Sequence, residues 1–298
     1  MNKNNLTGFV FASPWIIGFL AFTLYPLCAS LYYGFTDFNV FQSPRFVGLD
    51  NYRDLMGDDL FWKSIRNTLY LTVISTPVNL IFALLTAMLL NTRIRGLSVY
   101  RTVYYIPTII PLAATSLLWM WIMNGQYGLL NKLLGWVGLP QPGWFSDPAY
   151  SKMSLILMGL WGVGNIIIIF LASLQEVPQS LYESASIDGA GGFRKFRHIT
   201  IHWISPIILF QLIMQVINNL QYFTQAYFVI SSSNLNQVSG GPENSLLMYA
   251  VYLYQNAFIY FKMGKASAMA WILFVMAGIL TWIIFKSSKR WVTYGGGD

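Results

Sequence analysis

Six long apolar stretches alternate with more polar segments along the chain. Each stretch lacks Asp, Glu, Lys, Arg and His, and each is long enough, as an α-helix, to cross the roughly 30 Å hydrocarbon core of a bilayer. We expect six membrane-spanning helices at 8–34, 67–90, 102–123, 153–175, 205–230 and 266–285. The pattern therefore predicts an all-α membrane protein in which residues 1–298 form a single transmembrane domain.

Prolines inside the apolar stretches mark the places where the helices should bend. A proline removes one backbone hydrogen bond from a helix and crowds the preceding turn. Pro26 should therefore kink the first helix, and Pro107 and Pro111 should break the third.

The composition agrees with a membrane protein. Hydrophobic residues make up 55% of the chain and charged residues 10%, whereas soluble domains carry about 25% charged residues. The formal net charge of +7 would suit a nucleic-acid binder, but in a membrane chain it more often reflects basic loops on the inner side. We therefore expect no nucleic-acid partner.

The sequence contains little that could hold a metal ion. Its single cysteine, Cys28, excludes an intrachain disulfide. Its two histidines, His198 and His202, are four residues apart but lack the glutamate of a zinc-peptidase motif. We expect no metal site and no catalytic residue.

Basic residues crowd into short segments on one side of the predicted helices. Six spans place both termini on the same side, and with that side inside, the inner segments hold ten Lys and Arg residues against eight outside. The inner residues include Arg93, Arg95 and Arg101 between the second and third helices. Because basic loops tend to stay in the cytoplasm, we expect both termini and the 176–204 segment to be cytoplasmic.

None of the predicted spans carries an Asp, Glu, Lys, Arg or His side chain, and this bears on the energy source of transport. An ion- or proton-coupled carrier usually keeps such a group inside the membrane. The chain also lacks a P-loop, since its one Gly-Lys pair, Gly264-Lys265, has neither the upstream glycine nor the following Ser or Thr. We therefore infer that the chain is a passive transmembrane gate, which a partner protein opens and closes. Sodium coupling through carbonyls and hydroxyls stays open, as in a secondary carrier or channel for a neutral polar solute.

The segment between the fourth and fifth predicted helices is polar. Ser180 and Glu183 have the spacing of a capping box, which predicts a short helix over 180–187. Gly189 can end that helix in the left-handed conformation, and 193–201 predicts a second, basic amphipathic helix. Two short helices at an angle can enter a cleft on another protein. The alternative is an interfacial loop whose arginines bind lipid headgroups.

The fifth predicted helix is rich in amide side chains. At about 100° per residue, one face collects Gln211, Gln215, Asn218, Tyr222 and Gln225. Asn219 and Gln221 flank this stripe, and Asn165 and Trp161 on the fourth helix could line the same cavity. Polar groups are costly against lipid, so the stripe must face protein or water. Hydrogen bonds between helices and a path for a neutral, hydroxyl-rich solute both satisfy this requirement.

The 176–204 segment also carries a family motif. Glu183-Ser184-Ala185, Gly189, Ile199 and Pro206 resemble the EAA loop of ABC-transporter permeases, in which a second alanine usually stands at the position of Ser184. The chain also resembles carbohydrate permeases of the maltose and glycerol-phosphate type in the strings FVGLDNYRDL and GGPENSLLMYAVYLYQNAF. This resemblance implies a type I ABC importer permease with six transmembrane helices and a cytoplasmic coupling helix.

The resemblance also implies roles for individual residues. Those expected to couple to an ATPase are Glu183, Ser184, Ala185, Asp188, Gly189, Arg194 and Phe196. The resemblance points to Gln221 and Thr224 in the substrate pathway. The full expected set for this pathway is Asn165, Gln215, Asn218, Asn219, Gln221, Tyr222, Thr224 and Gln225.

The implied assembly has several partners. It contains a second, homologous permease subunit, two ATP-binding-cassette ATPases that bind ATP and Mg, and an extracellular solute-binding protein. This chain itself would hold no cofactor. The substrate would be a neutral sugar or oligosaccharide, and the location would be the cytoplasmic membrane of a bacterium or archaeon. The chain would be a transport subunit and not an enzyme.

Overall fold

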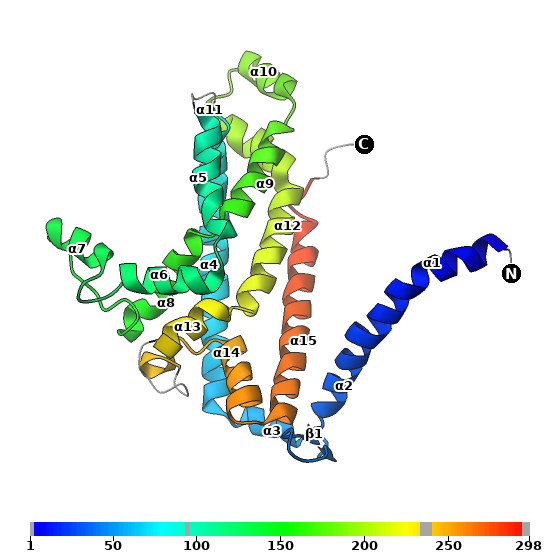
Figure 1. Cartoon of the computed structure of the whole chain (residues 1–298). Helices are drawn as coiled ribbons and strands as arrows, with labels where there is room; N and C mark the ends of the chain where they lie inside the picture. The colour runs from blue at the N-terminus through cyan, green and yellow to red at the C-terminus, as the bar shows by residue number, and fades with distance from the viewer. Residues whose placement is uncertain (1–2, 93–95, 233–239, 294–298) are drawn as a thin grey trace. The chain divides into compact units, whose positions relative to one another are not determined.

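The computed structural model describes residues 3–92, 96–232 and 240–293, and these residues are mostly helical (Figure 1). Arg93 and Arg95, which the sequence places in a basic turn, lie outside the described residues. The chain divides into two compact units. The first unit comprises 1–61 and 253–275, and the second comprises 62–252 and 276–298.

The first unit contains the N-terminal helices, a small hairpin and two short elements. They are α1 (Lys3–Phe19), η1 (Leu20–Leu24), α2 (Tyr25–Tyr33), β1 (Thr36–Asp37), β2 (Arg45–Phe46), α3 (Asp50–Met56) and η4 (Gln255–Ile259). Three helices have residues in both units: α4 (Asp59–Leu90), α14 (Tyr249–Tyr254) and α15 (Met263–Ser288). The paired β1 and β2 strands are an exception to the all-α prediction, and each has only two residues.

The N-terminal helices α1, η1 and α2 follow one another without a break (Figure 1). The π-turn η1, in which the Tyr25 N–H donates to the Leu20 carbonyl, ends two residues before Pro26. Pro26 has no N–H for the carbonyl four residues before it, and a π-turn is a common way to absorb such a defect. The predicted disturbance at Pro26 therefore takes the form of a widened turn.

Hydrogen bonds to backbone carbonyls hold the hairpin of the first unit in place. The Asn51 side-chain amide donates to the carbonyls of Gly34 and Thr36 at 3.0 and 2.9 Å. The Gly264 N–H donates to the Phe38 carbonyl at 3.0 Å. A Cβ at Gly264 would collide with the Thr36 carbonyl, so only glycine permits this close approach.

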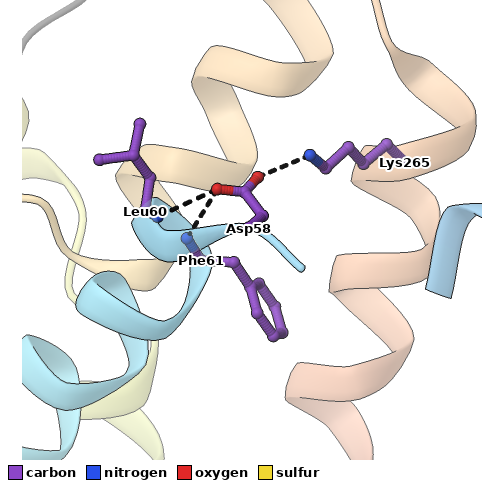
Figure 2. Close-up of polar contacts among 4 residues, drawn as sticks. All are labelled: Asp58, Leu60, Phe61 and Lys265. Carbon is purple, nitrogen blue, oxygen red and sulfur yellow. Dashed lines mark hydrogen bonds and ion pairs between the residues drawn. The ribbon is translucent and has the colours of Figure 1, made fainter. Parts of the chain in front are cut away.

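Asp58 connects the starts of α4 and α15 within the first unit (Figure 2). One carboxylate oxygen accepts from the backbone N–H groups of Leu60 and Phe61 at 3.0 and 3.3 Å, which caps the first turn of α4. The other lies 2.7 Å from the Lys265 ammonium. The side chains of Asp58 and Lys265 are only 16% and 15% exposed. Burial, and then the Asp58 charge, raise the pKa of the nearby Tyr260 hydroxyl.

The second unit contains the remaining elements. They are α5 (Leu97–Ile109), α6 (Leu112–Ile122), α7 (Leu129–Trp136), α8 (Pro148–Leu160), α9 (Gly164–Gln175), α10 (Gln179–Ile187), α11 (Gly192–Lys195), η2 (Phe196–Thr200), α12 (Ile201–Leu220), α13 (Thr224–Ser232) and η3 (Pro242–Asn244). Its buried core comes mainly from α4 and α9, and its members are Leu80, Ala83, Ala87, Leu90, Val163, Ile166, Ile167, Phe170, Leu171, Leu174, Val177 and Ile204. The chain also approaches itself closely at Gly164, where a Cβ would meet the Tyr104 carbonyl of α5.

Two of the predicted spans are bent pairs of helices. The axes of α5 and α6 differ by 102°, and those of α8 and α9 by 51° (Figure 1). The first bend follows from Pro111, because the residue before a proline is pushed into the extended region, and Ile110 has φ −71° and ψ 131°. Pro107, by contrast, lies inside the uninterrupted α5, so the expected break at that position was wrong.

Four helices of the described chain are long and apolar enough to cross a membrane by themselves. They are Phe11–Tyr33, Asp59–Leu90, Gly192–Ser232 and Met263–Ser288. Counting each bent pair as one span raises the number to six. The structure thus has four to six candidate membrane spans.

Candidate functional site

The helix α10 lies in the 176–204 segment and begins earlier than the sequence predicts. Its N-cap is Pro178, with φ −59° and ψ 129°, and no side chain caps its first turn in the described chain. The predicted capping box of Ser180 and Glu183 was therefore wrong. Because Pro178 has an extended backbone and Gln179 already begins the helix, Ser180 lies inside the first turn, where its hydroxyl is no longer at the capping position.

The end of α10 agrees with the prediction. Gly189 has φ +74°, in the left-handed region that favours glycine. The Ala190 N–H donates to the Ala185 carbonyl at 2.8 Å, and the Gly189 N–H donates to the Ser186 carbonyl at 3.1 Å. These two bonds form a Schellman motif, so Gly189 sets where α10 stops and the direction in which the chain leaves it.

The second short helix of the predicted pair is the start of a much longer one. The elements α11, η2 and α12 follow one another without interruption from Gly192 to Leu220. The sequence between Gly192 and Pro206 contains no glycine or proline that would stop a helix, and α12 continues through Pro206. In place of the predicted pair of short helices there is one short helix, α10, beside the N-terminal end (192–200) of a long helix.

Two side-chain hydrogen bonds hold α10 against the N-terminal end of this long helix. The hydroxyls of Tyr182 and Thr200 lie 2.8 Å apart, and the Lys195 ammonium donates to the Ser186 hydroxyl at 2.6 Å. The Tyr182 side chain also packs against the buried core that α4 and α9 share. Because its inner face is tied in these ways, α10 is positioned to pass a displacement on to the long helices.

The outward surface of the segment combines exposed apolar and charged side chains. Ile187 is 87% exposed and Phe193 is 76% exposed. Of the predicted coupling residues, Ala185 and Phe196 are half-buried, and the exposed ones are Glu183, Ser184, Asp188, Gly189 and Arg194. Exposed apolar side chains rimmed by polar ones are typical of a protein-binding surface. Sequence reasoning did not include Ile187 or Phe193 in this set, although Ile187 lies two residues before Gly189 and Phe193 directly follows Gly192.

The amide-rich stripe does not lie on one helix. The helix α12 ends at Leu220, Gln221 has φ −98° and ψ 20°, and α13 begins only at Thr224. The predicted span over 205–230 lies within the candidate span Gly192–Ser232, but its helix is interrupted at 221–223. Residues there include neither glycine nor proline, so the sequence carried no strong signal for a break.

Two of the predicted pathway residues bond to α4. The Asn219 amide donates to the Thr76 hydroxyl at 3.0 Å, and the Asn79 amide lies 3.5 Å from the Gln215 carbonyl oxygen. These contacts match the alternative of hydrogen bonds between helices. The stripe therefore helps to fix α12 against α4.

The other pathway residues surround the break or stand apart from it. Asn165, Asn218 and Gln221 are exposed, whereas Tyr222, Thr224 and Gln225 are half-buried. The Tyr222 hydroxyl is buried and has no hydrogen-bond partner among the described residues. Irregular backbone at membrane depth is tolerated where it lines a cavity or is covered by protein. The break can therefore present both backbone and side-chain hydrogen-bonding groups to a polar solute.

These features define a helical membrane protein with a short, largely exposed helix, α10, and a polar interruption in one of its spans. Residues 69–294 match the family of binding-protein-dependent transport system inner membrane components. The chain belongs to this family, and its relatives are permease subunits of transporters rather than enzymes.

Curated relatives match nearly the whole chain. The probable ABC transporter permease protein YesP of Bacillus subtilis (strain 168) is 41% identical over 297 residues, which cover 99% of this chain and 94% of that protein. The lactose transport system permease protein LacF of Rhizobium radiobacter is 31% identical over 292 residues, covering 96% and 95% of the two chains.

A solved structure shows the fold. The chain is similar to a subunit of a bacterial ABC transporter involved in the import of the acidic polysaccharide alginate, with a TM-score of 0.81 and 22% identity over 97% of this chain and 96% of that one. This likeness establishes a type I ABC importer permease fold, as the sequence predicted.

Proposed function

We propose that this chain is the membrane-spanning subunit of an ATP-driven importer for a neutral sugar or oligosaccharide. The observation that carries the proposal is α10, a short helix with an exposed apolar side chain at Ile187 and side-chain bonds to Lys195 of α11 and Thr200 of η2, at the start of the long helix that continues as α12. Family membership supports it, since the related LacF is a lactose permease and other relatives transport starch degradation products or trehalose and maltose. A self-sufficient secondary carrier is disfavoured, because the family depends on a binding protein.

In the proposed topology the whole chain is one transmembrane domain with six crossings. Each bent pair, α5 with α6 and α8 with α9, crosses the membrane once, and the other four candidate spans cross singly. Both termini and α10 then face the cytoplasm, in agreement with the basic residues of the inner segments. The location is the cytoplasmic membrane of a bacterium or archaeon.

The proposed coupling runs through the exposed residues of α10 and the turn after it. Glu183, Ser184, Asp188, Gly189 and Arg194 would contact an ATP-binding-cassette ATPase around Ile187 and Phe193, and Ala185 and Phe196 would support them from the half-buried face. ATP and Mg would bind to two such ATPases, and this chain would hold no cofactor. Closure of the ATPases would displace α10 and, through the Tyr182–Thr200 and Lys195–Ser186 bonds, the long helix α11–η2–α12.

The proposed substrate pathway passes the break after α12. Asn218, Gln221, Tyr222, Thr224 and Gln225 would offer amides, hydroxyls and an aromatic face to the sugar, with Asn165 of α9 joining them. Gln215 and Asn219 would hold the pathway in shape through α4. The spans as predicted contain no charged side chain, which favours an uncharged solute. A second permease subunit and an extracellular solute-binding protein complete the proposed assembly.

Co-expression with the neighbouring reading frames, followed by reconstitution in liposomes, tests the proposal. We expect this chain to co-purify with ATPase subunits and to take up a labelled neutral sugar only when ATP and the binding protein are supplied. Uptake by this chain alone without ATP would instead identify a secondary carrier. Uptake of a charged sugar in preference to every neutral one would refute the assigned substrate class.

A further inference from the structure

An aromatic pocket of about 500 Å³ lies at the C-terminal end of α6, away from the break that follows α12. Side chains from α6, from the turn after it and from the loop before α8 line it, and Ser232 at the end of α13 also contributes. We propose that this pocket is an outer subsite that binds one ring of the transported neutral sugar before the sugar reaches the break. This inference rests on the proposed function, because it assigns a second binding position to the same substrate.

A buried amide fixes the wall of the pocket in place. Asn131 of α7 is 2% exposed, and its side-chain N–H groups donate to the carbonyls of Gly125 and Pro142 at 2.9 and 3.0 Å. The Trp144 indole N–H donates to the Asn131 side-chain oxygen at 2.8 Å. These bonds tie two separate parts of the loop together and hold the Trp144 ring at the pocket wall. A pocket built in this way exists before a ligand arrives, as most small-molecule sites do.

The lining suits a sugar ring. Trp121 and Tyr127 are 66% and 55% exposed, and their aromatic faces can stack on the apolar face of a sugar. Ser146 lines the same pocket, and its hydroxyl makes no hydrogen bond within the described chain. None of the described lining residues is charged. The pocket therefore offers stacking and hydroxyl contacts but nothing that would neutralise an ionic ligand.

The place of the pocket in the fold connects it to the proposed pathway. The helix α13 starts at Thr224, directly after the break, packs against α6, and ends at Ser232 in the pocket. Its nine residues rise by about 13 Å at 1.5 Å per residue. In the proposed topology the pocket lies at the outer end of this helix and the break at its inner end. A sugar released outside would therefore meet the aromatic pocket first.

A lipid chain is the competing occupant, since tryptophans are common at the membrane interface. Ligand-observed NMR on the full chain in lipid nanodiscs separates the two, with maltose, lactose and cellobiose as uncharged probes and digalacturonate as a charged one. We expect at least one uncharged sugar to bind, and Trp121→Ala to weaken its binding roughly threefold to tenfold through loss of one stacking contact. Trp121→Phe, which keeps an aromatic ring, should bind the sugar with an affinity close to that of the wild type. This result would show that the site tolerates substitution at position 121.

Trp136→Ala is the matched control, because Trp136 is 84% exposed on α7 but does not line the pocket. Its sugar affinity should equal that of the wild type. The proposal is overturned if no uncharged sugar binds, if Trp121→Ala binds as well as the wild type, or if Trp136→Ala is equally impaired. ATP-driven uptake by the assembled transporter reports separately on the proposed function, so uptake with an unaffected Trp121→Ala would reject the outer subsite alone.

Discussion

Replacing Gly189 by alanine tests whether the shape of the turn after α10 matters for coupling. Gly189 has φ +74° and closes the Schellman motif through the bonds from Ala190 to Ala185 and from Gly189 to Ser186. A Cβ at this position would have no neighbouring atom within 4 Å. Gly189→Ala therefore introduces backbone strain without a steric clash, which makes the change unusually clean.

The expected magnitude follows from the backbone alone. A non-glycine residue in the left-handed region costs about 1–2 kcal/mol, and no packing penalty adds to it here. This free energy opposes the turn that presents α10 to the ATPase. The apparent Kd for the ATPase should rise by up to roughly fivefold to thirtyfold. Gly189→Asn should show a smaller effect, because asparagine tolerates this conformation better than alanine does.

The assay compares ATPase binding, and ATP consumed per sugar transported, in matched variants. Gly192→Ala is the control, because Gly192 lies three residues further along in equally open space and does not have a positive φ. We expect Gly192→Ala to behave as the wild type. Gly189→Ala should bind the ATPase more weakly and consume more ATP per sugar transported. The reasoning is refuted if both alanine variants are impaired equally, or if Gly189→Ala couples normally.

Further predictions concern contacts that hold the fold. Lys265→Met leaves the Asp58 carboxylate at the start of α4 without its nearly buried partner, and thermal unfolding in detergent should show a loss of about 2 kcal/mol. Arg53→Gln, which removes a largely exposed 3.7 Å ion pair, should cost no more than about 0.5 kcal/mol, and an equal loss in both variants would contradict the importance of burial. Asn219→Ala removes the hydrogen bond from α12 to α4 and should lower stability by about 0.6–2 kcal/mol. Gln221→Ala should instead lower sugar uptake while leaving the unfolding temperature unchanged. If Gln221→Ala lowered stability and Asn219→Ala lowered only uptake, the structural role given to Asn219 and the pathway role given to Gln221 would both be refuted.

Local signals in the sequence predicted one end of α10 and missed the other. Gly189 is informative because few other residues adopt its conformation at low cost, so the end of the helix could be placed. Ser180 and Glu183 had the right spacing for a capping box, but Pro178 starts the helix sooner. A side-chain cap contributes only about 1 kcal/mol, so it does not decide where a helix starts when a neighbouring proline has already fixed the backbone conformation.

Apolar length predicted where the spans lie but not how they bend. Pro111 marks the bend between α5 and α6 because it acts on the backbone of Ile110. The break at 221–223 has no comparable residue, and its position depends on packing that the sequence does not display. The contact between Asp58 and Lys265 joins residues 207 positions apart, and nothing in either local sequence indicates it.

The central claim is that the force for transport arrives from a cytoplasmic ATPase at the tip of α10. Photo-crosslinking in intact cells tests it most directly, with p-benzoylphenylalanine in place of Ile187 and, as a control, in place of the similarly exposed Trp136. The account predicts that the probe at Ile187 captures an ATP-binding-cassette subunit and that the probe at Trp136, which the proposed topology puts outside the cell, does not. Capture of an ATPase from Trp136, or none from Ile187, would contradict the account.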